Sequence, residues 1–122
     1  MNEAQLNLQT AVLDDGLGLI AAEGYINNEG GQAVADAATQ LVGGGCSSLV
    51  IDLEGTRIIN SIGVSILLEI MEKIMEGEGK LAFCNLTPTI AKTFEIMGLD
   101  QYAGIFPDQE AAVTSFSTDG AA

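Results

Sequence analysis

Histidine and tryptophan are absent from this 122-residue sequence, and only four of its residues are basic. Without histidine, the sequence lacks the commonest general base and any Ser-His triad. Seventeen acidic residues against those four basic ones give a formal net charge of −13. Because so few cations are present to neutralise phosphates, the composition argues against nucleic acid and anionic membranes as partners. It favours a protein partner with a neutral or basic docking face, although most acidic residues are expected simply to keep the surface soluble.

Cysteine is also scarce. Cys46 and Cys84 are far apart, and neither has a second thiol at metal-ligand spacing, so we expect free buried thiols and no disulfide or metal site. Glycines 43–45 lack the Gly-Lys-Ser/Thr of a phosphate loop, and no cofactor is predicted.

The first ten residues lack the basic and apolar regions of a secretory signal, and no apolar run approaches the roughly 20 residues that span a bilayer. We therefore expect a cytoplasmic protein without direct membrane insertion.

Hydrophobic residues make up 48% of the chain, whereas aromatic residues make up only 5%. This composition and length predict a single domain over residues 1–122, with a core at about 6–116 built mainly from Leu, Ile, Val and Ala. The tail at 117–122 is small and polar, and we expect it to be frayed.

Apolar patterning predicts strands that alternate with helices. Strands at 6–12 and 17–26, joined by the turn residues Asp14-Asp15-Gly16, form an antiparallel hairpin. Residues 49–53 are apolar on both faces, as is typical of a parallel strand, and further strands are predicted at 80–84 and 105–106. Helices follow residues that can cap them, namely Asn27 or Asn28, Asn60 or Ser61, Thr87 and Asp108. The order predicts an α/β fold with a mixed sheet, an opening antiparallel hairpin and then parallel strands, flanked by about four helices.

The helix after Ser61 has an apolar stripe. The predicted core positions recur at i, i+4 spacing and are Ile62, Ile66, Ile70 and Ile74. Leu67 and Met71 lie alongside them. Ile58 and Ile59, just before the helix, are interpreted as the end of a buried strand. Methionines 71, 75 and 97 lie at helical positions and are predicted to be core residues rather than a cofactor site.

Three polar junctions, at 27–28, 60–63 and 85–88, follow predicted strands. In an open α/β sheet, ligands and partners meet such loops at the carboxyl ends of the strands. At the middle junction a helix N-terminus presents free N–H groups, where a serine can cap the helix or carry a phosphoryl group. Because Asn and Ser are preferred caps, the interpretation that Asn60 or Ser61 simply caps the helix is favoured over a phosphorylation switch by roughly three to one. No nucleophile, base and oxyanion donors come together, so no catalytic residue is predicted.

Residues 50–99, VIDLEGTRIINSIGVSILLEIMEKIMEGEGKLAFCNLTPTIAKTFEIMGL, resemble a STAS domain, the family of the bacterial anti-sigma-factor antagonists. The resemblance extends from about Leu6 to Phe116. It rests on the order of elements, the strand ending in Asp52-Leu53, the junction before the second helix and the Thr-Pro…Phe…Met-Gly-Leu pattern. It implies the family's mixed sheet flanked by helices and a role in protein binding rather than catalysis.

The middle junction departs from the family pattern. In the bacterial antagonists it usually reads Asp-Ser-Ser-Gly or Asp-Ser-Thr-Gly, and the partner kinase phosphorylates the second hydroxyl residue. When the sequences are aligned on Gly63, that acceptor position is Ile62, and Asn60 replaces the aspartate. Asn27 likewise stands where many relatives have an aspartate. Ser61, which matches the first hydroxyl residue, is the remaining phosphorylation candidate.

The resemblance implies that the chain binds an anti-sigma factor or a related GHKL-type serine kinase, so that a sigma factor is released for transcription. The expected contact residues are Asn60, Ser61, Ile62, Gly63 and Val64, with Asn27 and Asn28 at the edge. Two alternatives stay open: an unphosphorylated STAS subunit of a lipid-transport or stress-signalling assembly, and a nucleotide or small-ligand binder. A weak homodimer also stays open.

Overall fold

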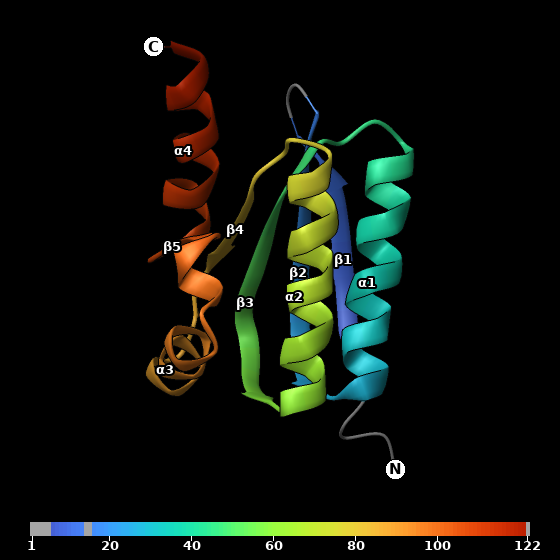
Figure 1. Ribbon diagram of the computed structural model, residues 1–122, viewed down its shortest axis with the longest axis vertical. Helices are drawn as coiled ribbons and strands as arrows, with labels where there is room; N and C mark the ends of the chain where they lie inside the picture. The colour runs from blue at the N-terminus through green and yellow to red at the C-terminus, as the bar shows by residue number, and fades with distance from the viewer. Residues whose placement is uncertain (1–5, 14–15, 122) are drawn as a thin grey trace.

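The computed structural model describes residues 6–13 and 16–121, which form five strands, four α-helices and a short 3-10 helix (Figure 1). In chain order the elements are β1 (Asn7–Val12), β2 (Leu17–Ile26), α1 (Asn28–Gly43), β3 (Ser48–Ile59), α2 (Ser61–Glu76), β4 (Leu81–Cys84), α3 (Pro88–Met97), η2 (Leu99–Gln101), β5 (Gly104–Phe106) and α4 (Gln109–Ala121). The predicted order of strands and helices is confirmed. The predicted turn at Asp14-Asp15 lies outside the described residues.

The strands form one mixed sheet in the order β1-β2-β3-β4-β5. β1 runs antiparallel to β2, with Asn7 opposite Glu23, and the remaining neighbours are parallel. This confirms the predicted mixed sheet. Since each helical crossover advances the chain by one strand in the same direction, right-handed connections place α1, α2 and α3 on the same face of the sheet.

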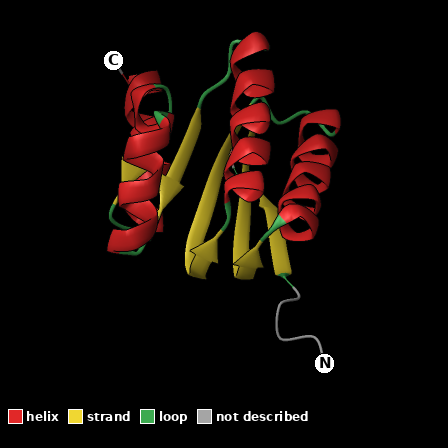
Figure 2. Ribbon diagram, turned by 60° about the horizontal axis from the view of Figure 1, so that its bottom comes forward, coloured by secondary structure: helices red, strands yellow, loops and turns green. Residues whose placement is uncertain are grey.

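Helices pack on both faces of the sheet. On the first face, α1 and α2 lie side by side against the strands (Figures 1 and 2), and α3 contributes Phe94, whose ring centroid lies 4.9 Å from that of Phe83. On the second face, Ala112 of α4 is buried against Leu17 and Val50. The predicted capping of α4 is also confirmed, because the Asp108 carboxylate accepts a hydrogen bond from the Ala111 N–H at 2.8 Å.

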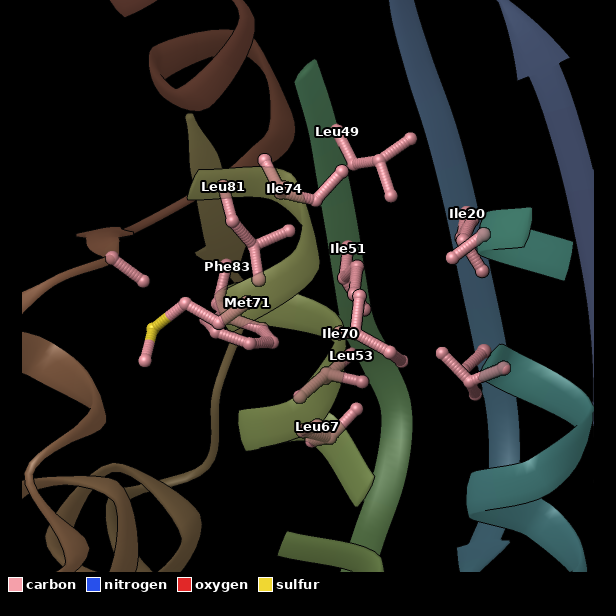
Figure 3. Packing of buried hydrophobic residues seen from close by; sticks show 14 of the residues in the cluster. Ile20, Leu49, Ile51, Leu53, Leu67, Ile70, Met71, Ile74, Leu81 and Phe83 are labelled. Carbon is pink, nitrogen blue, oxygen red and sulfur yellow. The ribbon is translucent and has the colours of Figure 1, made fainter. Parts of the chain in front are cut away.

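The apolar side of α2 fills the centre of the first layer. Its buried residues are Gly63, Val64, Leu67, Ile70, Met71 and Ile74. Figure 3 shows the larger of these side chains gathered with residues of β3 and β4, including Ile51, Leu53 and Phe83. The predicted stripe is therefore confirmed from Ile66 onward, with Ile66 itself half-buried against the core.

Several residues that were predicted to be buried are exposed. Ile62 is 53% exposed, because Gly63 and Val64 are the residues of the first turn of α2 that pack against the sheet, and Val64 takes the core position instead. Ile58 is 60% exposed, because β3 extends past the last residue of β4 that pairs with it and Ile58 lies on the second face, beside Tyr25. Met75 and Met97 are also exposed, and only Met71 of the three methionines is in the core.

Local sequence signals place α3 as predicted. The Thr87 side chain caps the helix by accepting a hydrogen bond from the Ile90 N–H at 3.2 Å, and Pro88 is the first helical residue. Gly98 ends the helix with φ of 84°, a left-handed conformation that glycine adopts without a Cβ clash.

Cys46 and Cys84 are free and buried, as predicted. Among the helices of the described chain, none has the length and apolar character needed to cross a bilayer.

The role of α2 as the centre of the core generates a stability prediction. Leu67→Ala removes a fully buried side chain, and we expect unfolding in urea to show a loss of about 2–5 kcal/mol. Ile96→Ala, on the exposed side of α3, is the matched control and is expected to change stability by less than about 0.5 kcal/mol. Equal stabilities for the two variants would contradict this orientation of α2.

Candidate functional site

Two strand–helix turns of the same construction lie side by side at the carboxyl end of the sheet. β2 ends with Tyr25-Ile26 before Asn27, and β3 ends with Ile58-Ile59 before Asn60. The register pairs Tyr25 with Ile58 and Ile26 with Ile59. Because side chains alternate across a strand, Ile26 and Ile59 face the helical layer, whereas Tyr25 and Ile58 face the opposite side.

An asparagine side chain caps each helix at these turns. The Asn27 Oδ1 accepts a hydrogen bond from the Gly30 N–H at 2.8 Å, and the Asn60 Oδ1 accepts one from the Gly63 N–H at 2.8 Å. The structure thereby decides between the capping candidates: Asn27 rather than Asn28, and Asn60 rather than Ser61. With Asn60 as the cap, Ser61 and Ile62 are the first two helical residues of α2, where backbone N–H groups have no partner within the helix.

Glycines allow the two helices to begin this close to the strands and to each other. A Cβ at Gly63 would overlap the Ile26 carbonyl oxygen, which itself accepts a hydrogen bond from the Asn60 N–H at 3.1 Å. A Cβ at Gly31 would lie 2.9 Å from Cδ1 of Ile66, on the neighbouring helix. The sequence signal for this close approach is the Asn-x-x-Gly spacing, which occurs at 27–30 and again at 60–63.

The predicted contact residues divide into an exposed and a buried group. Ser61, Ile62 and Asn28 are exposed, and Asn27 and Asn60 are half-buried because their side chains act as caps. Gly63 is buried, and Val64 is only 1% exposed, with its side chain in the core. The surface available at residues 60–63, which we call the β3–α2 junction, is therefore formed mainly by Ser61 and Ile62.

A buried carboxylate on the second face was not predicted from the sequence. Asp52 is 6% exposed, and its Oδ1 accepts hydrogen bonds from the Glu54 N–H at 2.9 Å and the Asn85 side-chain amide at 3.0 Å. Its Oδ2 accepts one from the Gln109 side-chain amide at 2.9 Å. Asn85 adopts φ of 61°, a left-handed conformation that asparagine tolerates better than most residues. Asp52 thus joins β3, the end of β4 and the first residue of α4.

Burial raises the pKa of the nearby Cys84 thiol to about 12, and the negative charges of Asp52, Asp108 and Glu54 add to the shift. Cys84 therefore stays protonated near neutral pH and does not act as a nucleophile. Among the side chains of residues 6–13 and 16–116, no group of three or more Cys, Asp and Glu residues is placed to hold a metal ion.

A family model described as "STAS domain" matches residues 10–112. The chain belongs to the STAS domain family. BtrV of Bordetella bronchiseptica, which bears the name of an anti-sigma factor antagonist, is 28% identical over 107 residues that cover 85% of this chain and 90% of BtrV. The chain is therefore an anti-sigma-factor-antagonist-like STAS protein.

Solved structures share this STAS fold. The crystal structure of an anti-sigma factor antagonist from Mycobacterium paratuberculosis has a TM-score of 0.80 at 23% identity, covering 92% of this chain and 94% of that one. The anti-sigma factor antagonist SpoIIAA, in its unphosphorylated form, has a TM-score of 0.73 at 17% identity, covering 92% and 98%. At such low identity, the likeness shows the fold alone.

The close approach at Gly63 generates a second prediction. Gly63→Ala should destabilise the protein by about 1–3 kcal/mol in urea unfolding, because the added methyl group meets a backbone oxygen that cannot rotate away. Gly43→Ala is the matched control, since a Cβ there meets nothing within 4 Å at the end of α1. It should leave stability unchanged or raise it by up to about 1 kcal/mol. A neutral Gly63→Ala would show that α2 can shift away from β2 at little cost.

Proposed function

We propose that this STAS protein acts as an anti-sigma-factor antagonist that binds an anti-sigma factor of the GHKL serine-kinase class. Binding at the β3–α2 junction would sequester that factor and release its sigma factor. The observation that carries the proposal is the exposure of Ile62, a large apolar side chain that is 53% exposed on a helix N-terminus fixed by the Asn60 cap.

The chemistry of this surface suits a protein partner. An exposed isoleucine gains by burial in an apolar pocket, and such anchors supply much of the energy at protein interfaces. The N–H groups of the first two residues of α2, which have no partner within the helix, can donate hydrogen bonds to a carboxylate or carbonyl oxygen of the partner. The net charge of −13 favours association with a partner that is basic around this contact.

Phosphorylation at the junction is disfavoured by the direction of the available hydroxyl. Ile62, at the second helical position, has no acceptor oxygen, and Ser61 is one residue earlier. A shift by one residue turns the side chain by roughly 100° about the helix axis, which is beyond the tolerance of in-line phosphoryl transfer. We therefore propose that the protein stays in its unphosphorylated, binding-competent form.

Added charge at the junction should weaken the partner complex. Ile62→Asp removes the apolar anchor and forces a desolvated carboxylate into the interface, so we expect at least a tenfold loss of affinity, with a smaller loss for Ser61→Asp. The measurement is calorimetry against the anti-sigma factor captured from the source organism and purified. Ile96→Asp on exposed α3 adds the same charge elsewhere and is expected to bind as the parent does. Parent-like affinity for both junction variants would place the interface elsewhere.

Restoring the family's hydroxyl should create a phosphate acceptor. After incubation with the cognate kinase and ATP, we expect mass spectrometry to find little phosphate on the parent and substantial phosphate at position 62 of Ile62→Ser. Ile62→Ala tests whether loss of the bulky side chain alone exposes Ser61 to the kinase. Stoichiometric phosphate on Ser61 of the parent would make Ser61 the working switch and reject the proposal of a constitutively unphosphorylated protein.

A further inference from the structure

The second face of the sheet is covered over only part of its area. In the part of the chain that the structure describes, α4 packs on this face, and its buried contacts are with Leu17, Val50, Ala82 and Cys84. These residues lie toward the amino end of β2 and on β3 and β4. Gln109, where α4 begins, is hydrogen-bonded to Asp52, and the helix runs from there away from the carboxyl ends of β2 and β3 (Figure 1). The remaining area, which we call the open half-face, contains Glu23, Tyr25, Glu54, Gly55 and Ile58.

The open half-face has an apolar pair at its edge. Tyr25 and Ile58 are register partners on β2 and β3, Tyr25 is half-buried, and Ile58 is 60% exposed. Both side chains are only two residues from the caps Asn27 and Asn60. The apolar pair therefore lies at the same end of the sheet as Ile62, which follows Ile58 by four residues around the end of β3.

Negative charge borders the apolar pair. A shallow depression of about 340 Å³ on the same face, two residues along β2 from Tyr25, is lined by residues of three strands. They are Ala21, Ala22 and Gly55 together with the polar and acidic residues Asn7, Gln9, Glu23, Asp52 and Glu54. The Asp52 carboxylate accepts its hydrogen bonds from a backbone N–H and two side-chain amides. None of these three donors carries a positive charge that would balance the carboxylate.

Glu23 and Glu54 are exposed and face this depression, and Arg57 is the basic residue nearest in sequence, at an irregularity of β3. The pairing of β2 with β3 is irregular on both sides of Gly55. On each side, β3 has two residues between neighbouring register pairs where β2 has one. Such β-bulges bend the strand and change the direction of its side chains. The open half-face therefore combines an apolar anchor point with a net negative rim.

We propose that the partner's contact does not stop at the β3–α2 junction but continues around the end of β3 onto the open half-face. The occupant is a segment of the anti-sigma factor that places an apolar side chain on Tyr25 and Ile58 and Lys or Arg side chains beside Glu23 and Glu54. This inference rests on the proposed function and names the chemistry of the partner. A second copy of this chain is a poor occupant, because its net charge of −13 would repel the acidic rim.

The test compares variants of the open half-face in calorimetry and stopped-flow binding with the purified anti-sigma factor. Ile58→Asp is expected to lower affinity at least tenfold, as for a central apolar anchor. The double variant Glu23→Lys and Glu54→Lys is expected to slow association and to weaken its dependence on salt concentration. Ile96→Asp is the control for added charge at an exposed isoleucine outside the surface.

Folding of each variant is checked by circular dichroism and thermal melting. If Ile58→Asp is less stable than the parent, Ile58→Ser is used in its place, because an uncharged serine at an exposed strand end should not lower stability. The Ile58→Ser variant lacks the apolar side chain and should still bind the anti-sigma factor several-fold more weakly than the parent.

The outcomes separate this inference from the proposed function. If Ile62→Asp weakens binding while Ile58 variants and the charge-reversal variant bind as the parent does, the contact stops at the junction and the inference is overturned, while the proposed function stands. If the parent binds no anti-sigma factor, both are rejected. If sedimentation shows a dimer of the parent that Ile58→Asp dissociates, the occupant is a second copy and the inference is likewise overturned.

Discussion

The close approach between the start of α2 and the Ile26 carbonyl oxygen is the constraint on which the surface of this STAS domain depends. That oxygen accepts a hydrogen bond from the Asn60 N–H, and Gly63 packs against it without a side chain. A larger residue at Gly63 would force the helix away from β2, and Asn60 would then lose its place as the cap. Because the helix start is fixed, the exposed position of Ile62 is also fixed.

The exposure of Ile62 and the capping of α2 by Asn60 therefore both follow from where the helix begins. In the first turn of α2, Gly63 and Val64 are the buried positions, whereas Ser61 and Ile62 are exposed. Burying Ile62 against a partner would remove from water a side chain that folding leaves exposed, and this provides a driving force for association. In the proposed function, a residue that cannot be phosphorylated thus also provides the apolar contact.

Much of the fold could be predicted from the sequence because the local signals are consistent with one another. The Thr87-Pro88 start and the Gly98 end of α3, for example, depend on backbone conformations that few other residues adopt. Exposure at Ile58 and Ile62 could not be predicted, because it depends on how far β3 extends past β4 and on where α2 meets the sheet. The role of Asp52 was missed for a related reason: its partners come from distant segments, and no local pattern identifies them. The contact at the junction, like its partner, stays a prediction.

The Asp52 carboxylate has a consequence for the order in which the chain folds. Its side-chain partners Asn85 and Gln109 are 33 and 57 residues away in the sequence, whereas the asparagine caps close loops of only three residues. Because loop closure costs more entropy as the loop grows, contacts between distant segments form after local ones. Folding is therefore expected to proceed from the capped strand–helix turns toward Asp52, and the start of α4 should be among the last parts of the chain to take its native position.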